Sequence, residues 1–489
     1  MEQPQEISIG AALAREAARQ PDKIAVQCED EARSWNDLHR RTNRIARGLA
    51  AKGVKFGDFL TVALPNGVGF VEACYAAWKL GAVPQPVSFR LPKGELRAIA
   101  ELANTPVVVG DANTTDAGKP VVTIAELLAA SSDDSDLEDR ISPSWKAPTS
   151  GGSTGRPKLI VAGQPGVASP TSAEFWRISP NDTVLMPAPL YHNGPIVTVF
   201  PALQVGARVI IMPRFDAEKT LQSIEKHRAT WVYLVPTMMG RIWRLPEEVR
   251  TKYDLSSLKT VWHLAAPCPP WLKEEWINWL GPQTIWELYG GTEGQARTVL
   301  NGEEWLNHRG SVGRVHESGE IKIFDSEGRE LPPGETGEVF MRRAAAVPET
   351  YRYIGAEARR IHDGWESLGD MGWFDEDGYL YLADRRSDMI LVGGANVYPA
   401  EIEAALEEHP LVQSCAVIGL PDDDLGNRIH AIVQPRGEVS ESDLLAHLAD
   451  RLVTYKRPRS IEFVNEALRD DAGKVRRSAL RAERIQKKE

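Results

Sequence analysis

Up to about residue 265, helical patterns alternate with short apolar runs along the chain. Helical patterns over residues 8–20 and 34–51 come first, and further helical stretches then follow the apolar runs. The runs are Phe59–Leu64, Ala82–Val87, Pro106–Gly110, Thr183–Pro187, Arg208–Met212, Trp231–Pro236 and Thr260–Ala265. Strands buried on both faces have this composition, and parallel neighbours need crossover helices between them. The pattern therefore predicts a large α/β domain built from parallel-sheet subdomains.

The pattern changes near residue 311. Polar and apolar residues now alternate, and turns such as Asp375-Glu-Asp-Gly separate the runs. The alternating runs are Glu320–Phe324, Gly337–Arg342 and Tyr379–Ala383. Alternation between turn sequences is typical of antiparallel hairpins. We expect a small β-barrel-like subdomain here.

A third pattern begins at Arg385. A helix is predicted over 399–409, strands over 412–419 and 428–434, and a further helix after Ser440-Glu-Ser-Asp443, which resembles a helix cap. About 105 residues are enough for a small domain. We therefore expect a large N-terminal domain of residues 1–384 and a small C-terminal α+β domain of residues 385–489.

Composition narrows the class of protein. The chain has 489 residues and a net charge of −11, which argues against a nucleic-acid-binding protein. The four cysteines are scattered without metal-site spacing, which favours free thiols in a reducing compartment. The N-terminus lacks a secretory pattern, and no apolar stretch approaches the ~20 residues that span a bilayer. We expect a cytoplasmic protein without a transmembrane segment, and a homodimer is an open alternative to a monomer.

The segment from Thr149 to Lys158 is rich in glycines and hydroxyls and ends in a lysine. Glycines let the backbone approach a phosphate, and hydroxyls and backbone amides donate to phosphate oxygens. The lysine is followed by Leu159 rather than Ser or Thr, so the segment is not the P-loop of kinases. A flexible linker is the alternative, but linkers rarely lead through Arg-Pro-Lys into an apolar strand. The candidate phosphate-binding residues are Thr149, Ser150, Gly151, Gly152, Ser153, Thr154, Gly155 and Lys158.

This segment resembles the nucleotide-binding signature of the adenylate-forming superfamily, which includes acyl-CoA synthetases, adenylation domains of nonribosomal synthetases and luciferases. Further segments resemble the family's motifs in the family's order. These are Trp78-Lys-Leu-Gly-Ala-Val-Pro84, Pro189-Leu-Tyr-His-Asn-Gly194, Tyr289-Gly-Gly-Thr-Glu293, Gly369-Asp370, Asp384-Arg-Arg-Ser-Asp388 with Gly393-Gly394, and Gly473-Lys474. The resemblance covers essentially the whole chain, and it implies ATP, Mg²⁺ and coenzyme A as cofactors.

The resemblance implies roles in the adenylation step. Lys474 is the candidate catalytic residue, because a mobile ammonium can bridge the carboxylate and the α-phosphate, where charge grows as the bond forms. Without the resemblance, Lys474 would be interpreted as a solvated lysine in a basic tail. Glu293 is the candidate magnesium ligand and, with Thr154, a further catalytic candidate. The other implied ATP-binding residues are Ala265, Ala266, Pro267, Glu287, Tyr289, Gly290, Thr292, Asp370 and Arg385.

The resemblance also implies an acyl pocket and a path for coenzyme A. The acyl-binding candidates are His192, Ala265, Gly290 and Gly291, and the CoA-binding candidates are Gly393 and Gly394. In the family, one orientation of the small domain presents the catalytic lysine, and the other presents the Gly-Gly loop.

The acid is predicted to be hydrophobic. Relatives that activate amino acids carry an Asp after the acyl-pocket motif, but this chain has no acidic residue between Tyr191 and Gly206. The residues there are mostly small and apolar, which suits a fatty, aryl or bulky polycyclic acid. The segment 381–399 resembles synthetases of bile, steroid or terpenoid acids. The chain is thus expected to be an AMP-forming acyl-CoA synthetase.

Two other functions stay open. One is an adenylating enzyme that passes the acyl group to a carrier protein, and the other is a scaffold that binds ligands without adenylation.

The sequence departs from the family's motifs at Ser387, at Leu368, after Lys158 and in the segment 467–474. None of these departures removes a charged group that is assigned to the chemistry.

Overall fold

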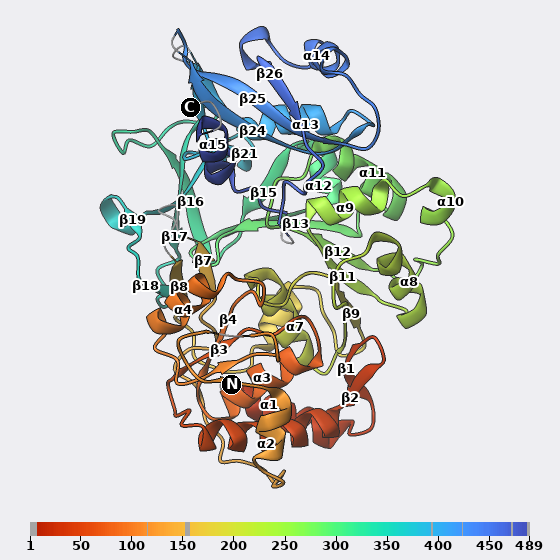
Figure 1. Cartoon of the computed structure of the whole chain (residues 1–489), viewed down its shortest axis with the longest axis vertical. Coiled ribbons are helices and arrows are strands. Elements are labelled where there is room, and N and C mark those ends of the chain that lie inside the picture. The colour runs from red at the N-terminus through yellow and green to blue at the C-terminus, as the bar shows by residue number, and fades with distance from the viewer. Residues whose placement is uncertain are drawn as a thin grey trace.

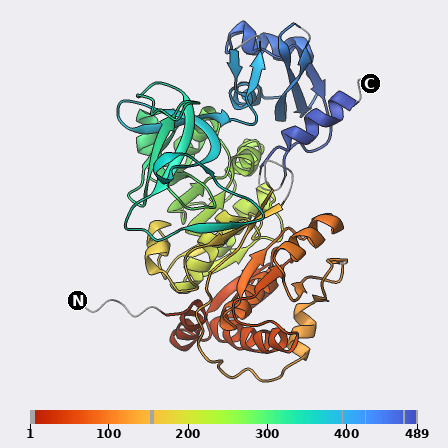
Figure 2. The same cartoon turned by 90° about the vertical axis from the view of Figure 1, so that its left-hand side faces the viewer.

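The computed structural model describes residues 7–114, 116–151, 157–392, 395–422, 424–470 and 473–486. Two parts stack along the long axis, with the N-terminal elements at the bottom of Figure 1 and the C-terminal ones at the top. The 90° view in Figure 2 separates the small C-terminal domain from the large N-terminal domain most clearly. This division into a large and a small domain confirms the expected architecture, while the boundary at residue 384 stays a prediction.

The N-terminal domain is built on one long mixed sheet. Within the described residues this sheet has 14 strands, one of which, β19 (Arg359–Arg360), pairs with β20 at the side. The other strands, in spatial order, are β16 (Gly319–Phe324), β17 (Gly337–Arg343), β20 (Glu366–Phe374), β21 (Tyr379–Arg385), β15 (Ser311–Val315), β14 (Arg297–Asn301), β13 (Ile285–Gly290), β12 (Thr260–His263), β11 (Trp231–Leu234), β9 (Thr183–Met186), β10 (Arg208–Ile211), β1 (Ile24–Cys28) and β2 (Glu31–Ser34).

The sheet is parallel from β1 to β13 and antiparallel from β13 to β16. The parallel part confirms the prediction made from the continuous apolar runs. The antiparallel hairpins also form, but they extend the same open sheet instead of closing into a separate barrel. The reason is that β14 pairs with β13 on one side and β15 on the other, which makes the two regions continuous.

Two smaller sheets complete the N-terminal domain. One is parallel, in the order β4 (Val83–Pro86), β3 (Phe59–Val62), β5 (Val108–Val109) and β6 (Val121–Val122). The other is antiparallel, in the order β18 (Tyr351–Ile354), β8 (Pro157–Ala162) and β7 (Thr149–Gly151). The second small sheet carries the ends of the predicted phosphate-binding segment.

Helices cover these sheets, and their caps follow from the sequence. Ser8 caps α1, and Ser34 caps α2 by accepting from the backbone N–H of Asp37. The helices of the N-terminal domain are α1 (Ile9–Arg19), α2 (Trp35–Ala51), α3 (Val68–Lys79), α4 (Lys93–Leu102), α5 (Ile124–Ala129), α6 (Pro170–Phe175), α7 (Asn193–Gln204), α8 (Ala217–His227), α9 (Pro236–Trp243), α10 (Glu247–Arg250), α11 (Pro270–Leu280) and α12 (Gly302–Asn307). No described helix has both the length and the apolar character that crossing a membrane requires.

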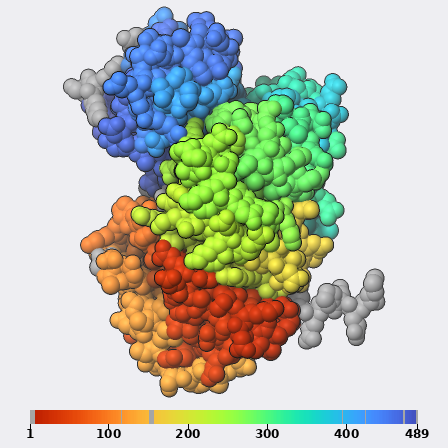
Figure 3. Space-filling model, turned by 90° about the vertical axis from the view of Figure 1, so that its right-hand side faces the viewer, coloured from red at the N-terminus to blue at the C-terminus, as the bar shows by residue number. Residues whose placement is uncertain are grey.

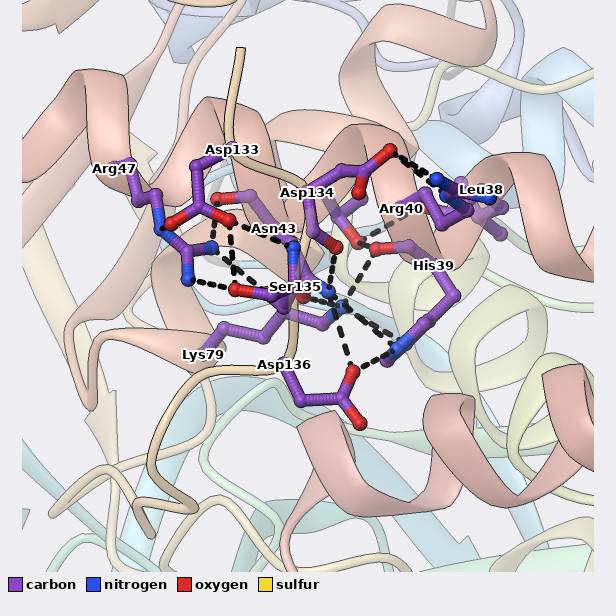
Figure 4. Close-up of polar contacts among 11 residues, drawn as sticks. Leu38, His39, Arg40, Asn43, Arg47, Lys79, Asp133, Asp134, Ser135 and Asp136 are labelled. Carbon is purple, nitrogen blue, oxygen red and sulfur yellow. Dashed lines mark hydrogen bonds and ion pairs between the residues drawn. The ribbon is translucent and has the colours of Figure 1, made fainter. Parts of the chain in front are cut away.

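A polar loop of residues 133–136 is fastened to α2, which also binds Lys79 at the end of α3 (Figure 4). Lys79 is buried, and its Nζ donates to Asn43 Oδ1 at 2.6 Å and to the carbonyl of His39 at 2.9 Å. The ring of His39 pairs with Asp136 of the loop at 2.6 Å, and Arg47 donates to the carbonyl of Ser135 at 2.8 Å. The loop therefore shields a lysine that lies among neutral acceptors.

The C-terminal domain has its own core. The sheet β24 (Val412–Asp422), β25 (Gly426–Pro435) and β26 (Ser460–Phe463) packs with α13 (Pro399–Glu407), α14 (Glu441–Ala449) and α15 (Arg477–Gln486), and a hairpin of β22 (Ile390–Val392) and β23 (Ala395–Val397) joins them. Ile402, Leu406, Val417 and Leu444 belong to its buried cluster. As the sequence predicts, Ser440 forms a capping box at the start of α14.

Candidate active site

Strands β7 and β8 fix the two ends of the predicted phosphate-binding segment. Ser150 pairs with Lys158 and Gly151 with Pro157 in an antiparallel register. The hydroxyl of Thr149 accepts a hydrogen bond from Gln85 Nε2 at 2.6 Å. The predicted residues Gly152, Ser153, Thr154 and Gly155 lie outside the described residues, as do Gly393 and Gly394. Lys158 is thus the charged member of the segment whose position the structure gives.

Lys158 and Glu293 meet at a tyrosine that the sequence analysis missed. Lys158 Nζ lies 3.7 Å from Glu293 Oε1 and 3.9 Å from the centre of the Tyr353 ring. The Tyr353 hydroxyl donates to the same Glu293 oxygen at 2.5 Å. Burial lowers the pKa of Lys158, and the nearby Glu293 opposes that shift. Tyr353 arrives on β18, which pairs with β8, so this contact joins residues distant in sequence.

Tyr289, Asp370 and Arg385 form a second group. The Tyr289 hydroxyl donates to Asp370 Oδ2 at 2.7 Å, and Arg385 Nε lies 3.4 Å from Asp370 Oδ1. Asp370 and Arg385 are partners in the register of β20 and β21. Burial, and then the Asp370 charge, raise the pKa of Tyr289. The structure therefore brings together three residues predicted for nucleoside binding.

Ala265, Ala266 and Pro267 follow β12, which is the neighbour of the strand that carries Tyr289. Ala265 has a φ of 78°, a left-handed conformation that costs a residue with a Cβ about 1–2 kcal/mol. Ala266 and Pro267 line a cavity shared with the C-terminal domain. The loop thus lies at the boundary between the domains.

Glu287 is held by a buried lysine. Lys273 Nζ donates to Glu287 Oε2 at 2.5 Å, and His263 Nδ1 lies 3.9 Å from Glu287 Oε1. Burial raises the pKa of Glu287, and Lys273 opposes the shift. Both residues of the pair are buried, and the proposed contact of Glu287 with ATP stays a prediction.

The two glycines after Tyr289 leave little room for a side chain. A Cβ at Gly291 would lie 2.3 Å from Leu368 Cδ1 and 2.8 Å from Glu293 Oε2, and one at Gly290 would lie 3.2 Å from the Ala296 carbonyl. Thr292 connects them to Glu293. Glycine at position 291 therefore lets Glu293 keep its place beside Lys158.

Lys474, in the C-terminal domain, lies within electrostatic range of this site. Crowding by the surrounding protein and the charge of Arg385 lower the pKa of Lys474, while Asp470, Glu293 and Asp370 act in the opposite direction. Lys474 is nevertheless exposed, so solvent screens these effects. Its electrostatic neighbours are thus the residues predicted for ribose and magnesium binding.

His192 lies at the start of the apolar helix α7. Burial, and then the charge of Lys474, lower the pKa of His192 to about 4, so the ring is neutral near pH 7. Its Nε2 is buried and has no hydrogen-bond partner among the described residues. The next residue, Asn193, accepts a hydrogen bond from Lys146, whose pKa burial lowers to about 7. Sequence analysis missed Lys146 because it belongs to no motif.

Comparison with known proteins identifies the family. The profile of the AMP-binding enzymes matches residues 13–351, and that of the AMP-binding enzyme C-terminal domain matches residues 401–474. The chain is 32% identical to feruloyl-CoA synthase from Amycolatopsis sp, over 97% of this chain and 98% of the relative. It is 28% identical to 2-succinylbenzoate–CoA ligase from a strain of Bacillus cereus, over 96% of this chain and 97% of the relative.

Solved structures have the same fold. The o-succinylbenzoate CoA synthetase of Bacillus subtilis, in complex with its acyl-adenylate intermediate, superposes with a TM-score of 0.84 at 27% identity, covering 97% of this chain and 98% of that chain. An anthranilate CoA ligase in complex with anthranoyl-AMP is alike in fold, with a TM-score of 0.84 at 24% identity, covering 99% of this chain and 98% of that chain. From the family profile, which covers most of the chain, and from these full-length likenesses, we conclude that the protein is a member of the AMP-binding enzyme family.

Proposed function

We propose that this protein is an AMP-forming acid–CoA ligase that activates a hydrophobic aryl acid. The observation that supports the proposal is that Lys474 of the C-terminal domain lies within electrostatic range of Asp370, Arg385 and Glu293 of the N-terminal domain. A lysine in that position can neutralise two anions held side by side, a carboxylate and an α-phosphate.

The donor set fits ATP and Mg²⁺. Tyr289 offers an aromatic face for adenine, and the Asp370 carboxylate suits ribose hydroxyls. Lys158 and the ends of the Thr149–Lys158 segment suit the phosphates. Glu293 offers a carboxylate oxygen, which Mg²⁺ prefers beside phosphate oxygens, and the ion would neutralise phosphate charge there.

In the first step, a carboxylate oxygen of the acid attacks the α-phosphorus of ATP. A P–O bond forms, the bond from the α-phosphorus to the bridging oxygen breaks, and pyrophosphate leaves with the electron pair. Charge grows on the oxygens around the α-phosphorus, where Lys474 stabilises it. The ring of His192 is neutral near pH 7, so it does not repel the ammonium of Lys474 and adds no charge to the proposed acyl pocket.

In the second step, the thiolate of coenzyme A attacks the acyl carbon. A C–S bond forms, the bond to the phosphate oxygen breaks, and AMP leaves. Gly393 and Gly394 are proposed to let the pantetheine arm pass close to the backbone.

The names of the relatives favour an aryl acid over the fatty, bile, steroid and terpenoid acids that the sequence also allowed. Feruloyl-CoA synthase and 2-succinylbenzoate–CoA ligase are both named for aryl substrates. Helix α7, which begins next to His192, is apolar and is proposed to supply one wall of the acyl pocket.

A panel of cinnamic, benzoic, fatty and steroid acids tests the proposal. Acid-dependent ATP–pyrophosphate exchange would demonstrate adenylation, and release of AMP with an acyl-CoA product would demonstrate the second step. Exchange without acyl-CoA, even from supplied acyl-AMP, would favour a carrier protein as acceptor. No exchange with any acid would favour a binding protein.

Lys474→Ala is expected to slow adenylation by about 10²–10³-fold, because it removes a cation needed in the transition state. Thioester formation from supplied acyl-AMP should be retained. Arg476→Ala removes a neighbouring exposed cation and should leave both steps unchanged. Equal loss of both steps in the Lys474 variant would contradict the assigned role.

A further inference from the structure

Helix α9 of the N-terminal domain contacts the C-terminal domain at both of its ends. Near its start, Thr237 lies against the loop that carries Lys474, because a Cβ on Gly473 would be 2.7 Å from Thr237 Oγ1. Just after its end, Arg244 extends to α13 and β24. Figure 3 shows the C-terminal domain lying directly on the green part of the chain that includes α9.

Arg244 binds backbone carbonyls across the domain boundary. Its Nη2 donates to the carbonyl of Glu407 and its Nη1 to that of Gln413, both at 3.3 Å. Glu407 is the last residue of α13, where carbonyls lack partners within the helix and the helix dipole favours a cation. In return, Arg436 donates to the carbonyl of Arg244 at 3.5 Å.

These contacts continue to the Lys474 loop through a second arginine. The Glu407 carboxylate lies 3.4 Å from Arg469 Nη2, and Arg469 Nη1 donates to the carbonyl of Gly473 at 3.2 Å. Arg244 also lies near enough to the Glu407 carboxylate to oppose the rise that burial causes in its pKa. Arg244, Glu407, Arg469 and Gly473 therefore form a continuous polar chain that ends next to Lys474.

We propose that Arg244 is a positioning residue for adenylation, and that α9 is the docking element that holds the C-terminal domain with Lys474 facing the nucleotide site. This inference rests on the proposed function in one respect, namely that Lys474 acts in adenylation. Arg244 touches no predicted substrate group, so it acts through the orientation of the domain that carries Lys474.

A merely structural role makes a different prediction. If Arg244 only stabilised α9 against Trp271, whose ring centre lies 5.5 Å from the guanidinium, its loss would lower stability and affect both half-reactions alike. A positioning role affects only the step that uses Lys474.

The kinetic test compares the two half-reactions in Arg244→Gln. Adenylation, followed by ATP–pyrophosphate exchange, should fall by about tenfold or more, because charge-assisted hydrogen bonds to the docked domain are lost. Thioester formation from supplied acyl-AMP should stay within about twofold of the wild-type rate. Arg244→Lys should restore part of the adenylation rate.

Arg241→Gln is the matched control. It removes one positive charge from α9, beside the same cavity, and no hydrogen bond from Arg241 to the C-terminal domain is found in the described parts of the chain. This variant should keep both rates. Equal slowing of both half-reactions in Arg244→Gln, or equal effects of the two variants, would overturn the proposal.

A second test needs no catalysis. Nitroxide labels are attached at the exposed positions Glu248→Cys and Glu438→Cys, and Cys268→Ser removes the free cysteine that is partly exposed. Double electron–electron resonance between the two labels then measures the distance between the domains. The labelled protein that retains Arg244 should give a narrow distance distribution, whereas the labelled Arg244→Gln variant should give a broad or shifted one. An unchanged distribution would reject the docking role even if the protein proved to adenylate no acid.

Discussion

At the scale of single residues, hydroxyl groups hold the carboxylates of the candidate site in place. Tyr353 donates to Glu293, and Tyr289 donates to Asp370. The sequence predicted Glu293, Tyr289 and Asp370 because they belong to ordered motifs. It did not predict Tyr353 or Lys146, because their partners are distant in sequence and no spacing pattern reveals such a contact.

Tyr353→Phe should weaken the use of Mg²⁺ and ATP. The change keeps the ring beneath Lys158 but removes the hydroxyl that orients Glu293, and a hydrogen bond to a charged group contributes about 1.5–3 kcal/mol. We expect adenylation to fall about tenfold or more and the Mg²⁺ concentration at half-maximal rate to rise.

Tyr351→Phe is the control, because that hydroxyl, on the same strand, donates to Glu366 instead, at 2.6 Å. A similar Mg²⁺ dependence in wild type and both variants would show that Tyr353 does not orient Glu293.

The buried Lys79 should make stability depend on pH. Burial lowers its pKa from 10.5 to about 7. Between these values the unfolded chain binds more protons than the folded protein, so the free energy of unfolding rises with pH, by at most about 1.4 kcal/mol per pH unit. Below pH 7 both states are protonated, and this contribution is flat.

Lys79→Met should remove that slope. Urea unfolding at pH 7, 8 and 9 measures it, and Lys52→Met, at an exposed position, should keep the wild-type slope. If the free energy of unfolding changed with pH to the same extent in wild type and Lys79→Met, Lys79 would stay protonated in the folded protein.

At the scale of elements, the sequence predicted those whose pattern is local. The parallel strands were recognisable because they are buried on both faces, and α1, α2 and α14 because a serine caps each of them. Strand β18 was not predicted, because its four residues carry no clean alternation and its partner β8 lies far away in the sequence. The expected barrel was not closed, because edge pairing between distant strands decides closure.

Gly163→Ala tests how tightly β8 is held beside β18. A Cβ at position 163 would lie 1.8 Å from the Glu349 carbonyl, so the backbone between the strands must shift. We expect the free energy of unfolding to fall by about 2 kcal/mol and ATP binding to weaken, since β8 carries Lys158.

Gly94→Ala provides the comparison for stability. Position 94 lies in α4, and a Cβ there would meet nothing within 4 Å. That variant should be stabilised by about 0.5–1 kcal/mol. Equal stability of the two variants would show that the β8–β18 junction adapts freely.

At the scale of the whole molecule, the sequence predicted two domains but not how they meet. The order of motifs indicated a C-terminal lysine that works with N-terminal residues, and Lys474 lies within electrostatic range of Glu293 and Asp370, while its catalytic role stays a prediction. The docking contacts of Arg244 end on backbone carbonyls. Every residue type has such a carbonyl, so no sequence pattern could have revealed them. A homodimer stays an open alternative.

The turn after β21 sets a practical limit for protein engineering. The backbone N–H of Arg386 donates to the Gly369 carbonyl at 2.7 Å, whereas the carboxylate of Asp388 pairs with Arg477 at 2.7 Å. Ser387 thus lies between a residue that binds the N-terminal domain and a residue that binds α15 of the C-terminal domain. Chimeras that exchange C-terminal domains between relatives should therefore recombine at this serine, because a crossover on either side would divide one of these two pairs between different parents.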